Sequence, residues 1–121
     1  MKYLPLLFFL AVAGCHSVPV RPVKSTVPTN ADLKKVETAI TKGGADRGWM
    51  SKNVAPNLME LTLNSRGHYL VVDVKYDTAS YLISYKDSTN MKYDPVKQTI
   101  HKKYEKWTGL LRQSIDKYLK N

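Results

Sequence analysis

Residues 58–86 read LMELTLNSRGHYLVVDVKYDTASYLISYK, and this stretch decides the fold. Apolar and polar side chains alternate within 58–64, 68–76 and 81–86, the two-residue period of strands that bury one face. The segments between them, NSRG and DTAS, consist of residues that favour turns. Short turns between consecutive strands predict a three-stranded antiparallel meander.

Helical patterns flank this predicted sheet on both sides. Asn30 can cap a first helix over residues 32–42, and Gly43-Gly44 can end it. Asp94 and Pro95 can begin a last helix. Its apolar side chains recur at steps of three and four: Ile100, Tyr104, Trp107, Leu111, Ile115 and Tyr118. We therefore expect an α+β fold of order α-β-β-β-α, with both helices packed on one face of the sheet.

Two further regions complete this expected domain. Residues 45–57 are predicted to form a connecting loop, from which Trp49 packs onto the core. The outer face of the sheet carries Tyr69, Val71 and Leu82 among polar residues. This face is expected to be partly exposed or to meet another protein.

The amino terminus reads MKYLPLLFFLAVAG over residues 1–14, followed by Cys15. A positive residue, a short apolar run and small residues before a cysteine are typical of a secretory signal. The apolar run is too short to span a membrane as a helix. The ending VAGC resembles a bacterial lipobox, which implies that residues 1–14 are removed and Cys15 is lipidated. Because His16, not an aspartate, follows Cys15, we expect an outer-membrane anchor facing the periplasm.

The segment that follows the anchor carries three prolines within residues 15–30: Pro19, Pro22 and Pro28. Such spacing interrupts helical and strand periodicity and favours an extended backbone. We therefore predict a semi-rigid tether over 15–30 and a single domain over 31–121.

Composition limits the classes of partner. The chain of 121 residues has a formal net charge of +9 and one cysteine, which excludes an internal disulfide or a cysteine-built zinc site. Much of the positive charge lies on the last predicted helix. In the periplasm this charge points to an anionic envelope component or an envelope protein, and not to nucleic acid.

The sequence offers no recognisable catalytic set. The histidines His16, His68 and His101 follow neither HxxxH nor HExxH spacing, and Ser88 lacks a GxSxG elbow. Gly43-Gly44 matches no nucleotide-binding loop. We expect no enzyme activity, no metal and no cofactor.

One group of residues is a candidate site for a ligand or partner. Tyrosine combines an apolar ring with a hydrogen-bonding tip, so several tyrosines near histidine and amide groups can line a ligand groove. They can equally form an aromatic half-core whose polar groups satisfy one another. The group consists of Tyr85, Ser88, Asn90, Tyr93, His101, Tyr104 and Trp107.

A longer pattern includes this group. It runs from Arg47-Gly48-Trp49 through Tyr76-Asp77 and YxIxYxDSxNxxY at 81–93 to IHxxYxxW at 100–107. The pattern resembles a group of small bacterial lipoproteins of unknown function, which implies an α+β lipoprotein domain without indicating an activity. The expected function is a non-catalytic binding or assembly module of the cell envelope. The alternative is a domain that binds a small ligand or glycan through the aromatic group.

Overall fold

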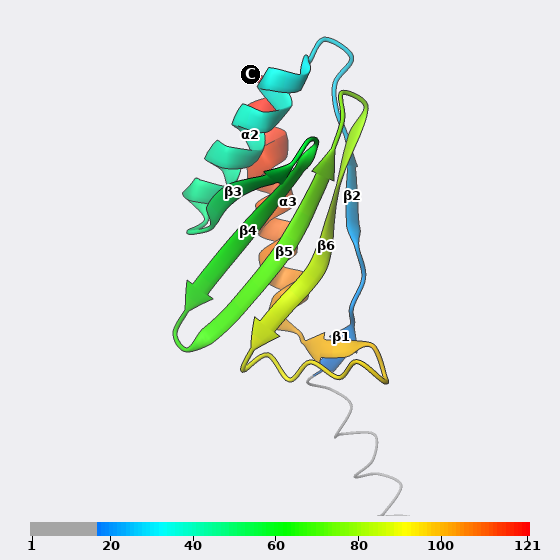
Figure 1. The fold of residues 1–121 in the computed structure, drawn as a ribbon, viewed down its shortest axis with the longest axis vertical. Coiled ribbons are helices and arrows are strands. Elements are labelled where there is room, and N and C mark those ends of the chain that lie inside the picture. The colour runs from blue at the N-terminus through cyan, green and yellow to red at the C-terminus, as the bar shows by residue number, and fades with distance from the viewer. Residues whose placement is uncertain (1–16) are drawn as a thin grey trace, which may run out of the picture.

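A computed structural model describes residues 17–121 (Figure 1). The predicted signal peptide and the predicted lipidation site, Cys15, lie outside the described residues. The elements in chain order are β1 (Ser17–Pro19), β2 (Val23–Thr26), α2 (Leu33–Asp46), β3 (Met50–Ala55), β4 (Leu58–Ser65), β5 (His68–Tyr76), β6 (Ser80–Thr89), β7 (Thr99–His101) and α3 (Lys103–Lys120).

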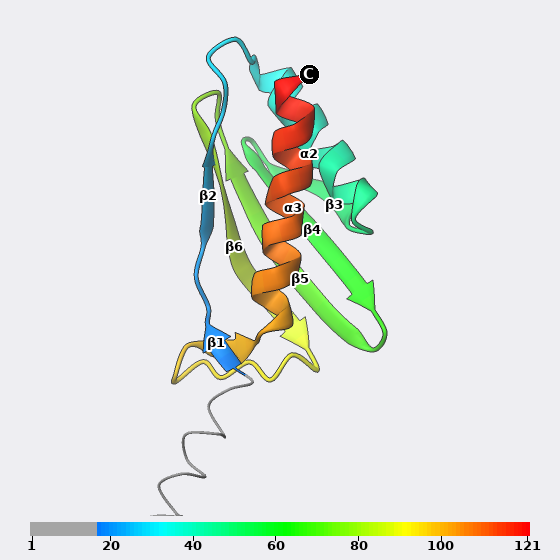
Figure 2. The same ribbon diagram turned by 180° about the vertical axis from the view of Figure 1, so that it is seen from behind.

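The α+β class is confirmed, but the sheet is larger than the sequence predicted. Five strands pair antiparallel in the order β2-β6-β5-β4-β3, and β1 pairs with β7 in a separate two-stranded sheet. Strands β4, β5 and β6 pair antiparallel in succession, with a register shift between Val71 and Val72 in the β5–β6 pairing. Figures 1 and 2 show both helices on one face of the five-stranded sheet, while the opposite face is open.

Strand β3 replaces the loop predicted over residues 45–57. Its sequence, MSKNVA, has no alternation of apolar and polar residues, and all six side chains are exposed. It lies at the edge of the sheet against β4, where only one side of its backbone is paired. Its position therefore depends on backbone pairing and not on a buried face, so its sequence gave no strand signal.

The prediction of a tether over residues 15–30 is wrong for the part that the structure describes. Pro19 ends β1, Pro22 lies between β1 and β2, and Pro28 follows β2. The prolines therefore avoid the interior of a paired strand, as their missing N–H requires. Both strands belong to the fold, which therefore includes residues before the predicted boundary of 31.

The helix boundaries also differ from those predicted. The carboxylate of Asp32, and not Asn30, caps α2 by accepting a hydrogen bond from the Lys35 backbone N–H at 2.8 Å. Helix α2 continues through Gly43-Gly44 to Asp46.

Helix α3 begins at Lys103, nine residues after the predicted cap at Asp94. The Asp94 side chain instead accepts hydrogen bonds from the backbone N–H groups of Val96 and Lys97, which forms a turn. Because aspartate before proline begins turns as well as helices, the sequence signal was ambiguous.

The core lies between the helices and the covered face of the sheet. Trp49 is buried there with 3% of its surface exposed, as predicted. The side chains buried most completely come from both layers: Tyr81, Tyr104, Ile40, Leu61, Leu70, Ile83, Met91, Ile100, Leu111, Ile115, Val36 and Val72. Among residues 17–121, no helix is both long and apolar enough to span a bilayer.

Candidate functional site

The structure divides the predicted aromatic group into two parts. In the first, the rings of Tyr85 and Tyr93 stack with centroids 4.2 Å apart, and Tyr104 meets Tyr85 edge-on at 6.1 Å. The hydroxyl of Tyr85 lies 2.7 Å from the hydroxyl of Ser88. These residues contact one another directly, which is the arrangement expected of an aromatic half-core.

Tyr104 is the most buried member of this part. Its side chain is 2% exposed, and its hydroxyl has no hydrogen-bond partner among the described residues. Burial raises the pKa of Tyr104 to about 12, with a smaller contribution from the neighbouring Tyr85. The ring therefore serves packing, and its hydroxyl is a destabilising group within the core.

The second part gathers around His68, which the sequence analysis placed only at the start of a strand. The ring of His68 lies 5.8 Å from that of His101 and 5.9 Å from that of Trp107. The carbonyl of Asn90 lies 2.7 Å from Nδ1 of His68, and the Lys103 ammonium lies 3.3 Å from Nε2.

His101 is held in its neutral form. Its Nδ1 accepts a hydrogen bond from the Lys103 backbone N–H at 3.0 Å, which requires an unprotonated nitrogen. Burial and the charges of Lys103 and Lys92 lower the pKa of His101. Across residues 17–121, no three His, Cys, Asp or Glu side chains come together as a metal site would require.

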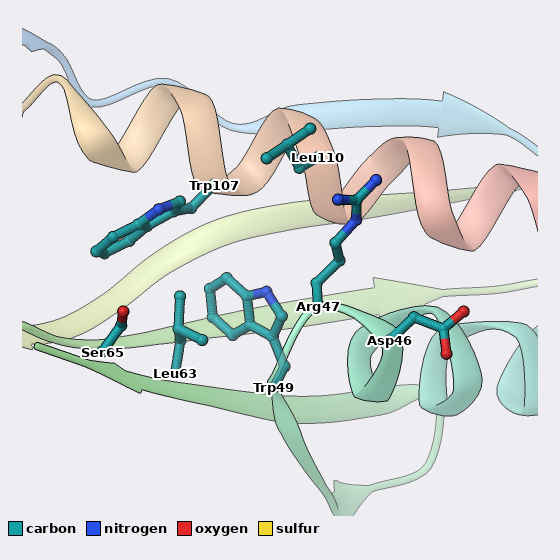
Figure 3. A pocket seen from close by; sticks show the side chains of 7 residues that line it. All are labelled: Asp46, Arg47, Trp49, Leu63, Ser65, Trp107 and Leu110. Carbon is teal, nitrogen blue, oxygen red and sulfur yellow. The ribbon is translucent and has the colours of Figure 1, made fainter.

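A pocket lies beside this second part, between the end of α2, strand β4 and helix α3 (Figure 3). Its volume of about 320 Å³ falls at the lower end of the range for small-molecule sites. Two indoles and two leucines line it together with three polar side chains. The lining residues are Asp46, Arg47, Trp49, Leu63, Ser65, Trp107 and Leu110.

The turn between α2 and β3 brings Arg47 and Trp49 to this pocket. Gly48 has a φ of 87°, a left-handed conformation that glycine adopts without strain. The backbone N–H of Trp49 then returns to the Gly44 carbonyl at 2.9 Å. This reversal directs the Trp49 side chain toward the core, next to Arg47 at the helix end (Figure 3).

Polar groups with defined orientations lie at one end of the pocket. The Nε of Arg47 donates to the Ser114 hydroxyl at 2.8 Å, which holds the guanidinium toward α3 (Figure 3). The carboxylate of Asp46 accepts a hydrogen bond from the Tyr118 hydroxyl at 2.5 Å and lies 4.0 Å from the Lys117 ammonium. Asp46 is thus engaged with α3, while the remaining nitrogens of Arg47 have no hydrogen-bond partner within residues 17–121.

Trp107 is the one member of the predicted group that lines this pocket. The sequence analysis did not identify the others as neighbours, because they come from three separate segments. One signal was present: Arg47, Trp49 and Trp107 all belong to the longer pattern quoted above. Comparison with protein-family models, with curated proteins and with solved structures finds no match to this chain.

Proposed function

We propose that this protein is a lipid-anchored, non-catalytic binding module of the bacterial cell envelope, and that the pocket beside Trp107 is its recognition site. The observation that carries this proposal is the convergence of both tryptophans of the chain on one pocket with an oriented arginine. Within the lining, Asp46 is engaged by the Tyr118 hydroxyl of α3, so the groups presented for binding are the Arg47 guanidinium, the Ser65 hydroxyl and the aromatic rings.

The anchor in this proposal is Cys15, at the end of the lipobox-like VAGC. An acylated cysteine would hold the protein in the outer membrane with the domain in the periplasm. Several acyl chains bind a bilayer far more firmly than one, since each buried methylene contributes about 0.8 kcal/mol.

The lining favours a sugar ring that carries a carboxylate. A pyranose presents a face of C–H groups, which can pack on the half-buried indole of Trp107, and a rim of hydroxyls for polar partners such as Ser65. The guanidinium of Arg47 suits a carboxylate, because its parallel N–H groups match the two oxygens. Acidic sugars of this kind occur in peptidoglycan, within reach of a periplasmic domain.

Tryptophan fluorescence tests the proposal directly, because both tryptophans of the protein line the pocket. Purified protein is titrated with soluble muropeptides from which an amidase has removed the stem peptide, so that the lactyl carboxylate of the sugar is free. It is titrated separately with N-acetylglucosamine oligomers, which lack the carboxylate. We expect muropeptides to change the emission and the neutral oligomers to bind more weakly. No spectral change with either sugar would contradict the proposal.

Two variants with a matched control sharpen this test. Arg47→Gln should weaken muropeptide binding roughly tenfold to a hundredfold, as expected when a charged hydrogen bond worth about 1.5–3 kcal/mol is lost. Trp107→Leu should weaken binding of both sugars. Lys52→Gln removes the same charge from the exposed strand β3 and should leave binding unchanged. An equal loss with Lys52→Gln would assign the effect to net charge and refute a specific site.

The open sheet face supports a second candidate function, the docking of an envelope protein. Figures 1 and 2 show both helices on the other face, and this face presents Tyr69 and Leu82, which are half-buried. In crosslinked envelopes, Tyr69→Glu or Leu82→Glu should then abolish recovery of a partner that wild type retains. Unchanged recovery would exclude this face.

A further inference from the structure

The end of the domain at which the described chain begins has a distinctive surface. Strand β1 pairs there with β7, so that Ser17 lies opposite His101 and Pro19 opposite Thr99. The segment 90–98 surrounds this pair at the same end (Figures 1 and 2). The β5–β6 hairpin, which contains Thr78, lies at the opposite end of the long axis.

A well-braced turn projects one apolar side chain from this surface. Val96 is 90% exposed, the largest exposure among the large hydrophobic residues described. The backbones of Asp94 and Thr99 bond to each other in both directions, at 2.9 and 3.2 Å. The Asp94 carboxylate also accepts from the backbone N–H of Val96 at 2.9 Å. These hydrogen bonds involve the backbone of Val96 and do not account for the exposure of its apolar side chain to water.

Positive charge surrounds this turn. Residues 91–103 contain four lysines and one aspartate, Asp94, whose carboxylate is engaged within the turn. Lys92, Lys97 and Lys102 are exposed, and none of them forms an ion pair with another described residue. Such a surface attracts anions and resists close approach of cations.

The covalent chain places the proposed anchor beside this surface. Only His16 separates Cys15 from Ser17, and two trans peptide links span at most about 7.6 Å between Cα atoms. A lipid on Cys15 would thus bring the bilayer to the end of the domain that carries Val96. The separation of some tens of ångströms that a tether would give is excluded, because β1 begins directly after His16.

We propose that this end of the domain is a membrane-contact surface, in which Val96 enters the interfacial region and Lys92, Lys97 and Lys102 bind phosphates of anionic lipids. This inference rests on the proposed lipid anchor at Cys15. The occupant is the bilayer that holds the anchor, since apolar tips flanked by lysine are the combination that binds a negatively charged membrane surface. The contact fixes the orientation of the domain, with the β5–β6 hairpin directed away from the membrane.

The full-length lipidated protein can test this contact with a single introduced thiol. The chain has one cysteine, so an acylated Cys15 leaves Val96→Cys or Thr78→Cys as the only site for a nitroxide label. The acyl mass of wild type is measured first. If wild type takes up the label instead, Cys15 is free and the proposed anchor fails, whatever the behaviour of the turn.

With the anchor established, the labelled proteins are placed in vesicles of phosphatidylcholine with and without phosphatidylglycerol. We expect the label at position 96 in anionic vesicles to become accessible to oxygen dissolved in lipid and inaccessible to a nickel complex in water. The label at position 78 should stay accessible to the nickel complex. Combining Lys92→Glu and Lys97→Glu should restore nickel access at position 96.

Three results would overturn the inference. Equal accessibility of the labels at positions 96 and 78 to the nickel complex would place the turn in water. Protection at position 96 that is the same with and without phosphatidylglycerol would exclude the proposed binding of the lysines to anionic lipids. Protection in detergent without vesicles would indicate contact between copies of the protein.

Discussion

The backbone of Gly43 packs directly on the backbone of Ile115, where helices α2 and α3 are in contact. A Cβ atom on Gly43 would lie 2.7 Å from the nitrogen and 2.8 Å from the Cα of Ile115. No side chain fits at that distance without separating the helices. The helix pair that covers the sheet therefore depends on a residue without a side chain.

Gly43→Ala should lower the free energy of unfolding by about 1–3 kcal/mol, the usual cost of overpacking a core. Gly109→Ala in α3 is the matched control, because a Cβ there meets no atom within 4 Å. It should instead stabilise the protein by about 0.5–1 kcal/mol through helix propensity. Urea unfolding measures both, and equal effects of the two substitutions would refute the close packing of the helices.

Tyr104→Phe should stabilise the protein by about 1 kcal/mol, because it removes a buried hydroxyl that lacks a partner. Tyr81→Phe is the contrasting variant. The Tyr81 hydroxyl donates to the Asp116 carboxylate at 2.5 Å, and its loss should cost about 1.5–3 kcal/mol. Thermal and urea unfolding compare the two variants. A destabilised Tyr104→Phe would show that its hydroxyl has a bonding partner.

Stability should fall at alkaline pH. Burial and a hydrogen bond to Glu37 raise the pKa of Tyr76 to about 12, and burial raises that of Tyr104 to about 12. In the unfolded chain both titrate near 10, so between these values the folded state retains protons that the unfolded state has lost. The contribution of these two tyrosines to the free energy of unfolding should therefore be constant below about pH 10 and decrease from there toward about pH 12.

Urea unfolding across this range checks the alkaline decrease. The variant that combines Tyr76→Phe with Tyr104→Phe should show a shallower decrease than wild type. It should retain part of the decrease, because burial and Asp116 also raise the pKa of Tyr81. A slope unchanged by both substitutions would contradict the role of these two hydroxyls.

Hydrogen exchange should distinguish folded amino-terminal strands from a tether. The backbone N–H of Val20 donates to the Gln98 carbonyl at 3.0 Å, and that of Val27 donates to the Ala79 carbonyl at 2.9 Å. Both amides should be protected by comparison with the amide of Thr78, which has no acceptor among the described residues. Rapid exchange of all three amides would contradict the pairing of these strands and support the predicted tether.

The sequence predicted those parts of the fold whose own residues face a core. The alternation at Met59, Leu61 and Leu63 corresponds to buried side chains in β4, and Tyr104, Leu111 and Ile115 form the buried stripe of α3. These patterns are local, so they can be read without knowledge of partners. The strands β1 and β2 lack such patterns, since their positions depend on distant backbone partners. Strand β3 lacks one because it is an edge strand whose side chains are all exposed.

The predicted end of the first helix differs from the observed one because a pair of glycines is compatible with two structures. A pair of glycines commonly ends a helix, but Gly43 and Gly44 lie within α2 because Ile115 and Leu61 approach them closely. The candidate site could be predicted only in part, because its residues come together through tertiary packing. The sequence identified Trp107, but its position beside Trp49 depends on the packing of α3 over β4, which no local pattern encodes.

The pairing of the amino-terminal strands also determines when the protein can finish folding. Ser17 pairs with His101 and Val23 with Ile83, so both amino-terminal strands pair with residues far away in the sequence. Until β2 pairs, β6 presents an unpaired edge to other chains, and closure of so long a loop slows that pairing. A chain in which β2 has not yet paired is therefore the form most prone to aggregation through β6, and a chaperone that shields strand edges would have its greatest effect on that form.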